Sequence, residues 1–317
     1  MIYNANLIIT NRCNSKCTNC SIWKEARKEK EMTIEEIEKL FSIKELRGLT
    51  ELGISGGEPF LRNDLVEVLE AIFKINNNIE KIYLTTNASM KKNVKKVCKL
   101  LEEKNKKLCL GISIDGDREI NQIIRGVDSY NNAIELIKEI KENYPTVDVQ
   151  ISFTICKRNC KRYILEHIKK IAKQLDCDYS FRIAEISEQY YRNTKVDNDL
   201  SKAQMKLVIN FIIENKLKDD FMKEALYYYI TGKVPIMYDY KNNVNKCEAG
   251  KSFVFIQADG KIYPCLYSNK AIGDINGFYK DIDIDYKLLK CPCMTECTVW
   301  PMIIKYKNNK EEKNDNK

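Results

Sequence analysis

Three cysteines stand close together near the start of the chain, in the segment NRCNSKCTNC at residues 11–20, which we name the cysteine loop. Cys13, Cys17 and Cys20 follow directly on the apolar run NLIIT, so a predicted strand delivers all of them on one loop. A structural zinc site normally takes four protein ligands, whereas three thiolates leave one position of an inorganic centre open. The spacing C-x3-C-x2-C therefore predicts a 4Fe-4S cluster with one iron available to an outside ligand. The alternatives are a zinc site with a distant fourth ligand and three unrelated thiols.

Composition places these thiols in an ordinary globular chain of 317 residues and 37.0 kDa. Apolar residues make up 44% and charged residues 31%, and no apolar stretch reaches the length of a membrane span. The N-terminus lacks a basic region followed by an apolar signal segment, so we expect a cytoplasmic protein whose 13 cysteines stay reduced and favour metal chemistry over disulfides. The net charge of +8 comes from dispersed lysines without interleaved aromatic residues, which indicates a solvated surface and neither nucleic acid nor membrane as a partner.

Strand and helix patterns alternate along the first two thirds of the chain. The strand candidates cover residues 5–10, 51–56, 81–87, 108–115, 148–156 and 179–185. Helical patterns separate them at residues 33–47, 63–76, 92–104, 128–143 and 161–174. Six β-α repeats in succession predict an α/β fold, in which a parallel sheet curls into a partial (β/α)6 barrel of the TIM type.

One face of these strands is polar, unlike the apolar interior of an ordinary barrel. In LCLGISID every second residue is Leu or Ile, and period-two alternation sends these residues to the side of the helices. The other set, together with its counterpart in DVQISFTIC, consists of Cys109, Gly111, Ser113, Asp115, Gln150, Ser152, Thr154 and Cys156. This lining predicts a cavity for a polar ligand at the C-terminal ends of the strands. An antiparallel sheet with one solvated face is the alternative, which the regular helical crossovers disfavour.

The second strand ends in a further motif, GISGGEPFLR at residues 53–62. Strand, cysteine loop, helix and this motif together resemble the radical S-adenosylmethionine (SAM) enzymes over residues 5–185. The resemblance implies that the three cysteines hold a 4Fe-4S cluster whose open iron binds the amino and carboxylate groups of SAM. It also implies that the reduced cluster splits SAM into methionine and a 5′-deoxyadenosyl radical. Gly56 and Gly57 are then expected to let the backbone approach the methionine moiety, and Glu58 to accept a hydrogen bond from its ammonium group.

Four more positions match the family less tightly. The resemblance places Ser113 and Asp115 of SIDG near polar groups of SAM, and Asn87 of TTNA within reach of the same cavity. Arg125 of IIRG suits the methionine carboxylate, because a guanidinium pairs well with a planar anion. A helix cap or a surface ion pair is the alternative for Asp115, Asn87 and Arg125.

Asn19 marks a departure from the family pattern. The residue before the third cysteine is usually aromatic in these enzymes and packs near adenine. Trp23 is a candidate to take this role here, and the resemblance leaves open what packs on the adenine.

A second group of cysteines lies near the C-terminus. Cys247 and Cys265 stand at the two ends of a predicted hairpin that turns at ADGK, and CPCMTEC adds three more. The pattern resembles the twitch or SPASM extensions of radical SAM enzymes, which carry auxiliary iron-sulfur clusters. We expect a twitch-like or shortened extension with one auxiliary 4Fe-4S cluster, because five cysteines suffice for one. Its expected ligands are Cys247, Cys265, Cys293 and Cys297, with Cys291 as the replacement for one of the last two; a structural zinc ribbon is the alternative.

The chain is therefore expected to have four parts. They are a radical SAM core barrel at residues 1–199, a helical linker at 200–246, a small α+β auxiliary-cluster domain at 247–300 and a charged tail at 301–317. The composition of the tail predicts that it is disordered.

These features predict a radical SAM oxidoreductase that abstracts a hydrogen atom from a peptide, as in ribosomal peptide maturation, or from a small polar substrate. The auxiliary cluster would serve as electron conduit, and a partner such as flavodoxin or ferredoxin would act as reductant. One alternative is an epimerase of peptides or of aminoglycosides and other carbohydrates, in which Cys156, Cys160 or Cys177 returns a hydrogen atom; a buried structural role is the simpler interpretation of these thiols. A second alternative is a non-catalytic iron-sulfur or zinc protein that transfers electrons or binds a partner. It explains the cysteines but neither GGEP nor IIRG.

Overall fold

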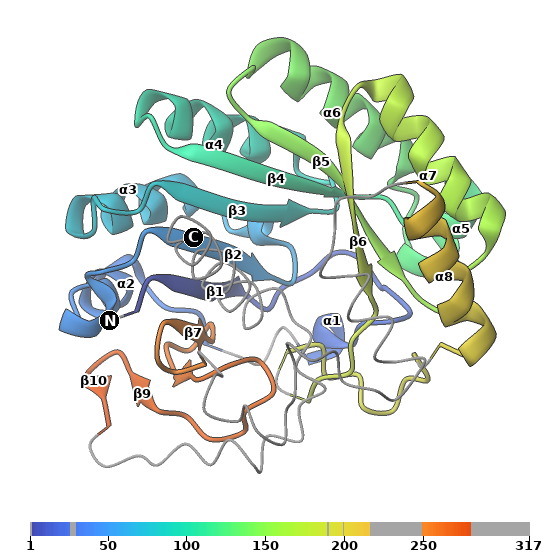
Figure 1. Cartoon of the computed structure of the whole chain (residues 1–317). Helices are drawn as coiled ribbons and strands as arrows, with labels where there is room; N and C mark the ends of the chain where they lie inside the picture. Colours follow the sequence, from blue (N-terminus) through green and yellow to red (C-terminus); the bar gives the residue numbers. More distant parts are fainter. Residues whose placement is uncertain (1, 26–29, 189, 199, 216–248, 280–317) are drawn as a thin grey trace, which may run out of the picture.

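The computed structural model describes residues 2–25, 30–188, 190–198, 200–215 and 249–279. Within them, one sheet has the strand order β10-β9-β8-β7-β1-β2-β3-β4-β5-β6 (Figure 1). The strands are β1 (Asn4–Thr10), β2 (Glu51–Gly56), β3 (Lys81–Thr86), β4 (Lys107–Ser113), β5 (Asp148–Ile155), β6 (Asp178–Ile183), β7 (Phe253–Ile256), β8 (Ile262–Tyr263), β9 (Gly273–Asp274) and β10 (Gly277–Phe278). The α-helices are α1 (Ile22–Glu25), α2 (Ile34–Phe41), α3 (Leu65–Ile75), α4 (Lys91–Glu103), α5 (Arg118–Arg125), α6 (Tyr130–Asn143), α7 (Arg162–Leu175) and α8 (Lys202–Glu214), and short 3-10 turns lie at Lys44–Leu46 and Pro59–Leu61.

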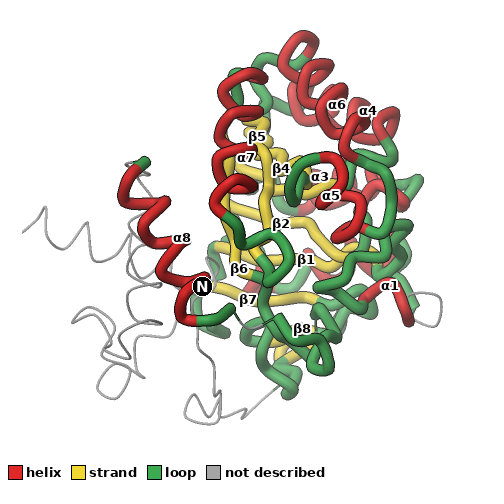
Figure 2. Tube along the Cα trace, turned by 90° about the vertical axis from the view of Figure 1, so that its right-hand side faces the viewer, coloured by secondary structure: helices red, strands yellow, loops and turns green. Residues whose placement is uncertain are grey.

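Strands β1 to β6 pair in parallel, each with its neighbour in sequence, and helices cover their outer side (Figures 1 and 2). This confirms the predicted α/β fold of the partial-barrel type. The sheet is not closed, because β6 and β10 are its two end strands. The additional helix α5 was not expected: Asp117 caps its N-terminus by accepting from the Ile120 N–H, and Gly126 ends it in the left-handed region at φ +65°.

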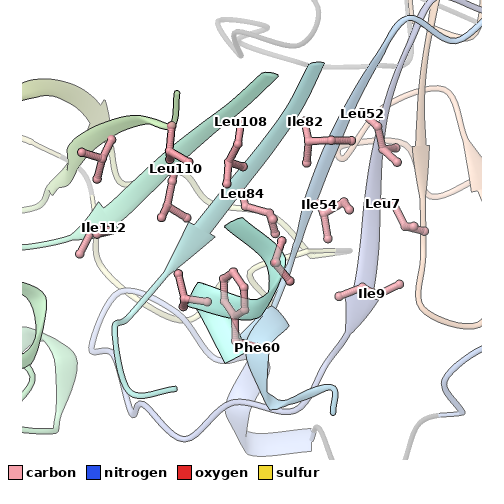
Figure 3. Packing of buried hydrophobic residues seen from close by; sticks show 14 of the residues in the cluster. Leu7, Ile9, Leu52, Ile54, Phe60, Ile82, Leu84, Leu108, Leu110 and Ile112 are labelled. Atoms are coloured by element: carbon pink, nitrogen blue, oxygen red, sulfur yellow. The ribbon is translucent and has the colours of Figure 1, made fainter. Parts of the chain in front are cut away.

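The apolar residues of the strands pack against the helices, as their alternation predicts. Leu7, Ile54, Leu84 and Leu110 are at most 1% exposed and belong to one cluster with Phe60 (Figure 3). Burial of one such side chain contributes roughly 1.5–3 kcal/mol. On β2 to β6 the residues of the opposite parity are mostly polar, and polar contacts link neighbouring strands on this face. Ile8 of β1 and Phe253 and Phe255 of β7 form a second apolar cluster there.

Two of these inner contacts link neighbouring strands. The Ser55 hydroxyl donates to Asn6 Oδ1 at 2.9 Å, and the Tyr83 hydroxyl donates to Glu51 Oε2 at 3.3 Å. Because polar groups on a buried face need such partners, the interior is built for a polar environment.

The C-terminal hairpin extends the same sheet. Strand β7 pairs in parallel with β1 and antiparallel with β8, and the turn between them covers the predicted ADGK segment. The sheet therefore runs without a break from the expected core into the expected extension, and α8 lies in the expected linker. Cys247, Cys291, Cys293 and Cys297, the linker beyond residue 215 and the tail lie outside the described residues. In the described ranges, no helix has both the length and the apolar character needed to cross a membrane.

Candidate functional site

The cysteine loop leaves the C-terminal end of β1, at the edge of the sheet where the parallel strands β2 to β6 also end. Cys13, Cys17 and Cys20 are all partly exposed there. Burial, together with a smaller contribution from the neighbouring Cys17, raises the pKa of the Cys13 thiol to about 12 and that of Cys20 to about 11. Iron binds the thiolate form, so the binding of a cluster has to offset the free energy of deprotonating these thiols. A nearby cation lowers this cost, because it stabilises the thiolate.

Two glycines bring the end of β2 against the cysteine loop. A Cβ on Gly56, whose φ is +140°, would lie 2.1 Å from the Thr10 carbonyl oxygen, and a Cβ on Gly57 would lie 2.1 Å from that of Arg12. The N–H groups of Gly57 and Glu58 donate to the same two carbonyls at 2.8 Å. The glycines thus let two protein backbones meet, and their approach to a methionine moiety stays a prediction.

Glu58 joins the ends of β2 and β3. Its buried carboxylate, 2% exposed, accepts from the Asn87 N–H at 2.7 Å, the Thr86 hydroxyl at 2.9 Å and the Phe60 N–H at 3.3 Å. Burial raises the pKa of Glu58 to about 7, although these three donors oppose the shift. A carboxylate has about four lone-pair sites, so the predicted bond from an ammonium group is compatible with this arrangement.

Asn87 connects β3 to the cysteine loop. Its side-chain amide donates to Asn14 Oδ1 and to Ser15 Oγ, both at 2.8 Å. Ser113 ends β4 and is 7% exposed, opposite Ser152 in register. Asn87 therefore positions the loop, while a direct contact of Asn87 or Ser113 with SAM stays a prediction.

Asp115 and Arg125 form an ion pair beside the loop. Arg125 Nε lies 2.6 Å from Asp115 Oδ2, and Asp115 Oδ1 accepts from the Thr154 N–H at 2.8 Å. The Nε–H does not point at the carboxylate well enough to count as a hydrogen bond. Burial lowers the pKa of Arg125, but Asp115 and Cys17 raise it more, so it stays cationic. Its Nη1 lies 4.0 Å from Cys17 Sγ, where a positive charge favours the thiolate.

The C-terminus of α5 holds the middle of the cysteine loop through its backbone. The N–H groups of Lys16 and Thr18 donate to the carbonyls of Arg125 at 2.9 Å and Ile124 at 2.8 Å. Gly126 lies against Lys16 so closely that a Cβ would be 2.8 Å from the Lys16 carbonyl oxygen. The IIRG segment thus supplies both a charge and a docking surface for the loop.

Trp23 supports the loop from its other end. The indole N–H donates to the carbonyl of Cys20 at 3.0 Å and more weakly to that of Cys17 at 3.4 Å. The carbonyl of Asn19 accepts from Asn193 at 2.7 Å. These bonds show how the backbone is held, and the packing of Trp23 on adenine stays a prediction.

The three candidate hydrogen donors lie in different places. Cys156 follows β5 at the edge that carries the cysteine loop, is 3% exposed, and has Asp115 among the charges that act on its pKa, which burial raises. Cys160 lies in the apolar core, with its thiol 3.5 Å from the Gln204 carbonyl oxygen. Cys177 precedes β6 and so lies at the opposite edge of the sheet. The structure brings only Cys156 of the three to the candidate site.

Three buried asparagines at this edge escaped sequence reasoning. Asn121 accepts from the Asp115 N–H at 2.8 Å, and Asn159 donates to the Asp115 carbonyl at 3.0 Å. Asn193 bonds to the loop as described above, and all three are at most 1% exposed. Asparagine is common in turns, so no pattern in the sequence separates these residues from exposed ones.

The donor set of the loop fits an iron-sulfur cluster. Three thiols share one loop, and the buried cation Arg125 lies beside one of them. In the described part of the chain, no three Cys, His, Asp or Glu side chains meet in a geometry that fits a single metal ion. A cluster does not require this geometry, because each thiolate binds a different iron.

A sequence profile of the Radical SAM superfamily matches residues 7–171, more than half of the chain. The chain therefore belongs to the radical SAM superfamily. It is an enzyme whose cofactors are a 4Fe-4S cluster and SAM. The alternative of a non-catalytic protein is set aside.

Curated relatives and solved structures extend this likeness. The chain is 24% identical over 274 residues to a probable GTP 3′,8-cyclase of Methanocaldococcus jannaschii, covering 84% of this chain and 86% of that one. It is 28% identical over 282 residues to the GTP 3′,8-cyclase of Aquifex aeolicus, a match that covers 83% of this chain and 81% of that one. Among solved structures, the chain is similar to Streptococcus suis SuiB bound to SAM, with a TM-score of 0.64 and 16% sequence identity. The match covers 86% of this chain and 63% of the SuiB chain. The structure of anSMEcpe with bound AdoMet has a TM-score of 0.60 at 18% identity, and the match covers 94% of this chain and 83% of that one. At these identities, the structures show the fold alone.

Proposed function

We propose that this enzyme abstracts a hydrogen atom from a small polar substrate held in the barrel interior, with Cys13, Cys17 and Cys20 as the ligands of its SAM-binding cluster. The observation that carries the proposal is the meeting of three elements at one edge of the sheet: the cysteine loop, the Gly56–Glu58 motif and the Asp115–Arg125 pair. When bound, the cluster and SAM together supply the 5′-deoxyadenosyl radical that removes the hydrogen atom.

The chain's own residues hold this assembly in place. Asn87 and the end of α5 fix the loop on two sides, and Arg125 keeps a positive charge next to Cys17. Glu58 is the candidate acceptor for the amino group of SAM, and Ser113 and Asp115 are candidates for its other polar groups. Because Arg125 pairs with Asp115, we propose that it acts mainly on Cys17, with any contact to the methionine carboxylate being secondary.

The polar interior supports a polar substrate, and a cation on it suits an anionic one. Arg182 pairs in register with Thr154 on the inward parity of β6, near the end of the strand where the candidate site lies. Guanidinium and ammonium groups are the usual partners of phosphate. The curated relatives act on GTP by their names, so we place a nucleotide before a peptide or an aminoglycoside as the first substrate class to test.

We further propose that the C-terminal extension holds an auxiliary 4Fe-4S cluster and carries electrons away from the substrate. Of its expected ligands, Cys265 lies in the described residues; it is 1% exposed and packs in one cluster with Phe255 of β7. The division into core, linker, extension and tail remains part of this proposal, as does a reducing partner such as flavodoxin or ferredoxin.

The test uses GTP that carries deuterium at the 3′ position. Anaerobically reconstituted, dithionite-reduced protein is incubated with SAM, with and without this GTP, and 5′-deoxyadenosine is analysed by mass spectrometry. We expect GTP to speed SAM cleavage and to transfer deuterium to 5′-deoxyadenosine. Arg182→Gln should raise the KM for GTP about tenfold, as loss of one charge-assisted contact predicts, whereas Arg47→Gln, on an exposed turn, should not.

SAM cleavage that GTP neither speeds nor labels would refute a nucleotide substrate. Peptides and aminoglycosides would then be tested in the same assay. Absence of SAM cleavage by protein that holds its iron would refute the proposed chemistry itself.

A further inference from the structure

The segment between β6 and α8, residues 184–198, contacts three parts of the enzyme; we name it the post-β6 segment. In Figure 1 it is the yellow loop that passes beside α1 and the C-terminal strands. Residue 189 of this segment lies outside the described part of the chain, and the contacts below do not involve it.

Asn193 is the centre of the hydrogen bonds in this segment. Its side-chain amide donates to the carbonyl of Asn19 at 2.7 Å and to that of Glu185 at 2.8 Å, and its Oδ1 accepts from the Ser187 N–H at 3.0 Å. Asn198 donates to the same Asn19 carbonyl at 3.3 Å. Asn193 is 1% exposed, so it uses both amide hydrogens and its oxygen away from water.

The post-β6 segment also holds Ser21, the residue that follows Cys20. The Ser21 N–H donates to the Tyr191 carbonyl at 2.8 Å. Residues 19 and 21 are therefore both fixed by the post-β6 segment, whereas Lys16 and Thr18 are fixed by α5. Apart from the indole of Trp23, which bonds to both Cys17 and Cys20, the backbone on the two sides of Cys20 is held by other residues than the backbone on the two sides of Cys17.

The segment also reaches β7 and the end of β2, the two strands that flank β1. The Ser187 hydroxyl donates to the Leu266 carbonyl at 3.1 Å, directly after Cys265. The ring of Tyr190 packs edge-on against Phe255 of β7 with centroids 5.7 Å apart. The phenol of Tyr190 lies at the end of β2, where it is hydrogen-bonded to Ser55 and to the Gly56 backbone. These bonds lower the pKa of Tyr190, but burial raises it more.

We propose that Asn193 is a positioning residue for Cys20, and that the post-β6 segment sets this cysteine relative to the hairpin that carries Cys265. An amide is needed here, because the group must donate to two carbonyls and accept from one N–H; an aspartate of the same shape cannot donate. The inference rests on the proposed role of Cys20 as a cluster ligand.

The test is hydrogen exchange at single backbone amides in the anaerobically reconstituted, full-length Asn193→Asp variant. The variant loses the hydrogen bond from Asn193 to the Asn19 carbonyl, so the post-β6 segment should separate from the cysteine loop more often. We therefore expect the Ser21 amide, which bonds to Tyr191 of this segment, to exchange about tenfold faster than in the parent. The Lys16 and Thr18 amides should change less than about twofold, because α5 holds them. The matched control is Asn143→Asp, an exposed asparagine that donates to the Glu139 carbonyl of its own helix.

A second readout is the EPR spectrum of the reduced cluster after addition of SAM. We expect it to change in Asn193→Asp and to stay the same in Asn143→Asp, while iron content and SAM cleavage on the same samples report separately on the proposed function. If Asn193→Asp does not fold, Asn198→Asp takes its place, with a smaller rise at Ser21 as the expected result. Unchanged Ser21 exchange, an equal rise at Lys16, Thr18 and Ser21, or an unchanged EPR spectrum would overturn the proposal.

Discussion

Glu58 carries a carboxylate that the fold buries almost completely, and the free energy of unfolding should therefore depend on its ionisation. Its pKa of about 7 in the folded protein compares with 4.5 for a solvated glutamate. This difference corresponds to about 3 kcal/mol. Because the pKa is raised by folding, that stability is fully present below about pH 4.5 and is lost as the pH rises through about 7.

The perturbation that isolates this contribution is Glu58→Gln, which keeps the shape of the side chain and removes the titration. Urea unfolding of the metal-free, reduced, full-length protein is measured between about pH 5 and 8.5. We expect the parent to lose about 2.5 kcal/mol relative to Glu58→Gln across this range, because part of the total is already lost at about pH 5. Glu67→Gln, on the exposed face of α3, controls for the loss of a negative charge. If the free energy of unfolding changed with pH in the same way for the parent and for Glu58→Gln, the reasoning from burial would be refuted.

The Ala variant separates the structural role of Glu58 from its role towards SAM. Glu58→Ala leaves three donors without their acceptor, at about 1–3 kcal/mol each, and should lower the free energy of unfolding at every pH. It should also weaken SAM binding while the iron content stays intact. SAM binding equal to that of the parent would show that the cofactor has been placed wrongly.

Three further predictions concern the cysteine loop, the extension and the substrate radical. Gly126→Ala should reduce iron occupancy and destabilise the protein by about 1–3 kcal/mol, because its φ of +65° and its contact with Lys16 exclude a Cβ; Gly277→Ala, also at positive φ but with open space around it, should lose less iron. Reconstituted parent should hold about eight irons, and replacing all three loop cysteines by Ala should remove about half of them; unchanged iron, or zinc in its place, would contradict the two-cluster account. Turnover in deuterated water should give a product lighter by two hydrogens, whereas a product of otherwise unchanged mass that carries deuterium, with the label lost in Cys156→Ala, would establish epimerisation.

Local patterns predicted the sheet because they are written in short stretches of sequence. The alternation in LCLGISID and DVQISFTIC placed apolar residues towards the helices and polar ones inside, and the structure has both. The apolar runs before the cysteine loop and before the GGE motif likewise predicted that both follow the C-terminal ends of strands, as they do after β1 and β2. Such signals need only neighbouring residues, and the backbone period converts them directly into a face or an edge.

Contacts between distant segments could not be predicted in the same way. Asn193 meets Asn19, which lies 174 positions away, and nothing near either residue indicates the bond. Arg125 lies against Asp115 and Cys17 because of the unexpected helix α5, and its expected contact with SAM stays a prediction. Gly56 and Gly57 fit the cysteine loop itself, a need that appears only once β1 and β2 are paired.

The most direct test of the account is the formation of 5′-deoxyadenosine by the reconstituted, dithionite-reduced protein with SAM alone. The account predicts slow cleavage by the parent, and none when Cys13, Cys17 and Cys20 are replaced together by Ala. Cleavage that persists in the triple variant, or parent protein that holds its iron and forms no 5′-deoxyadenosine, would contradict it.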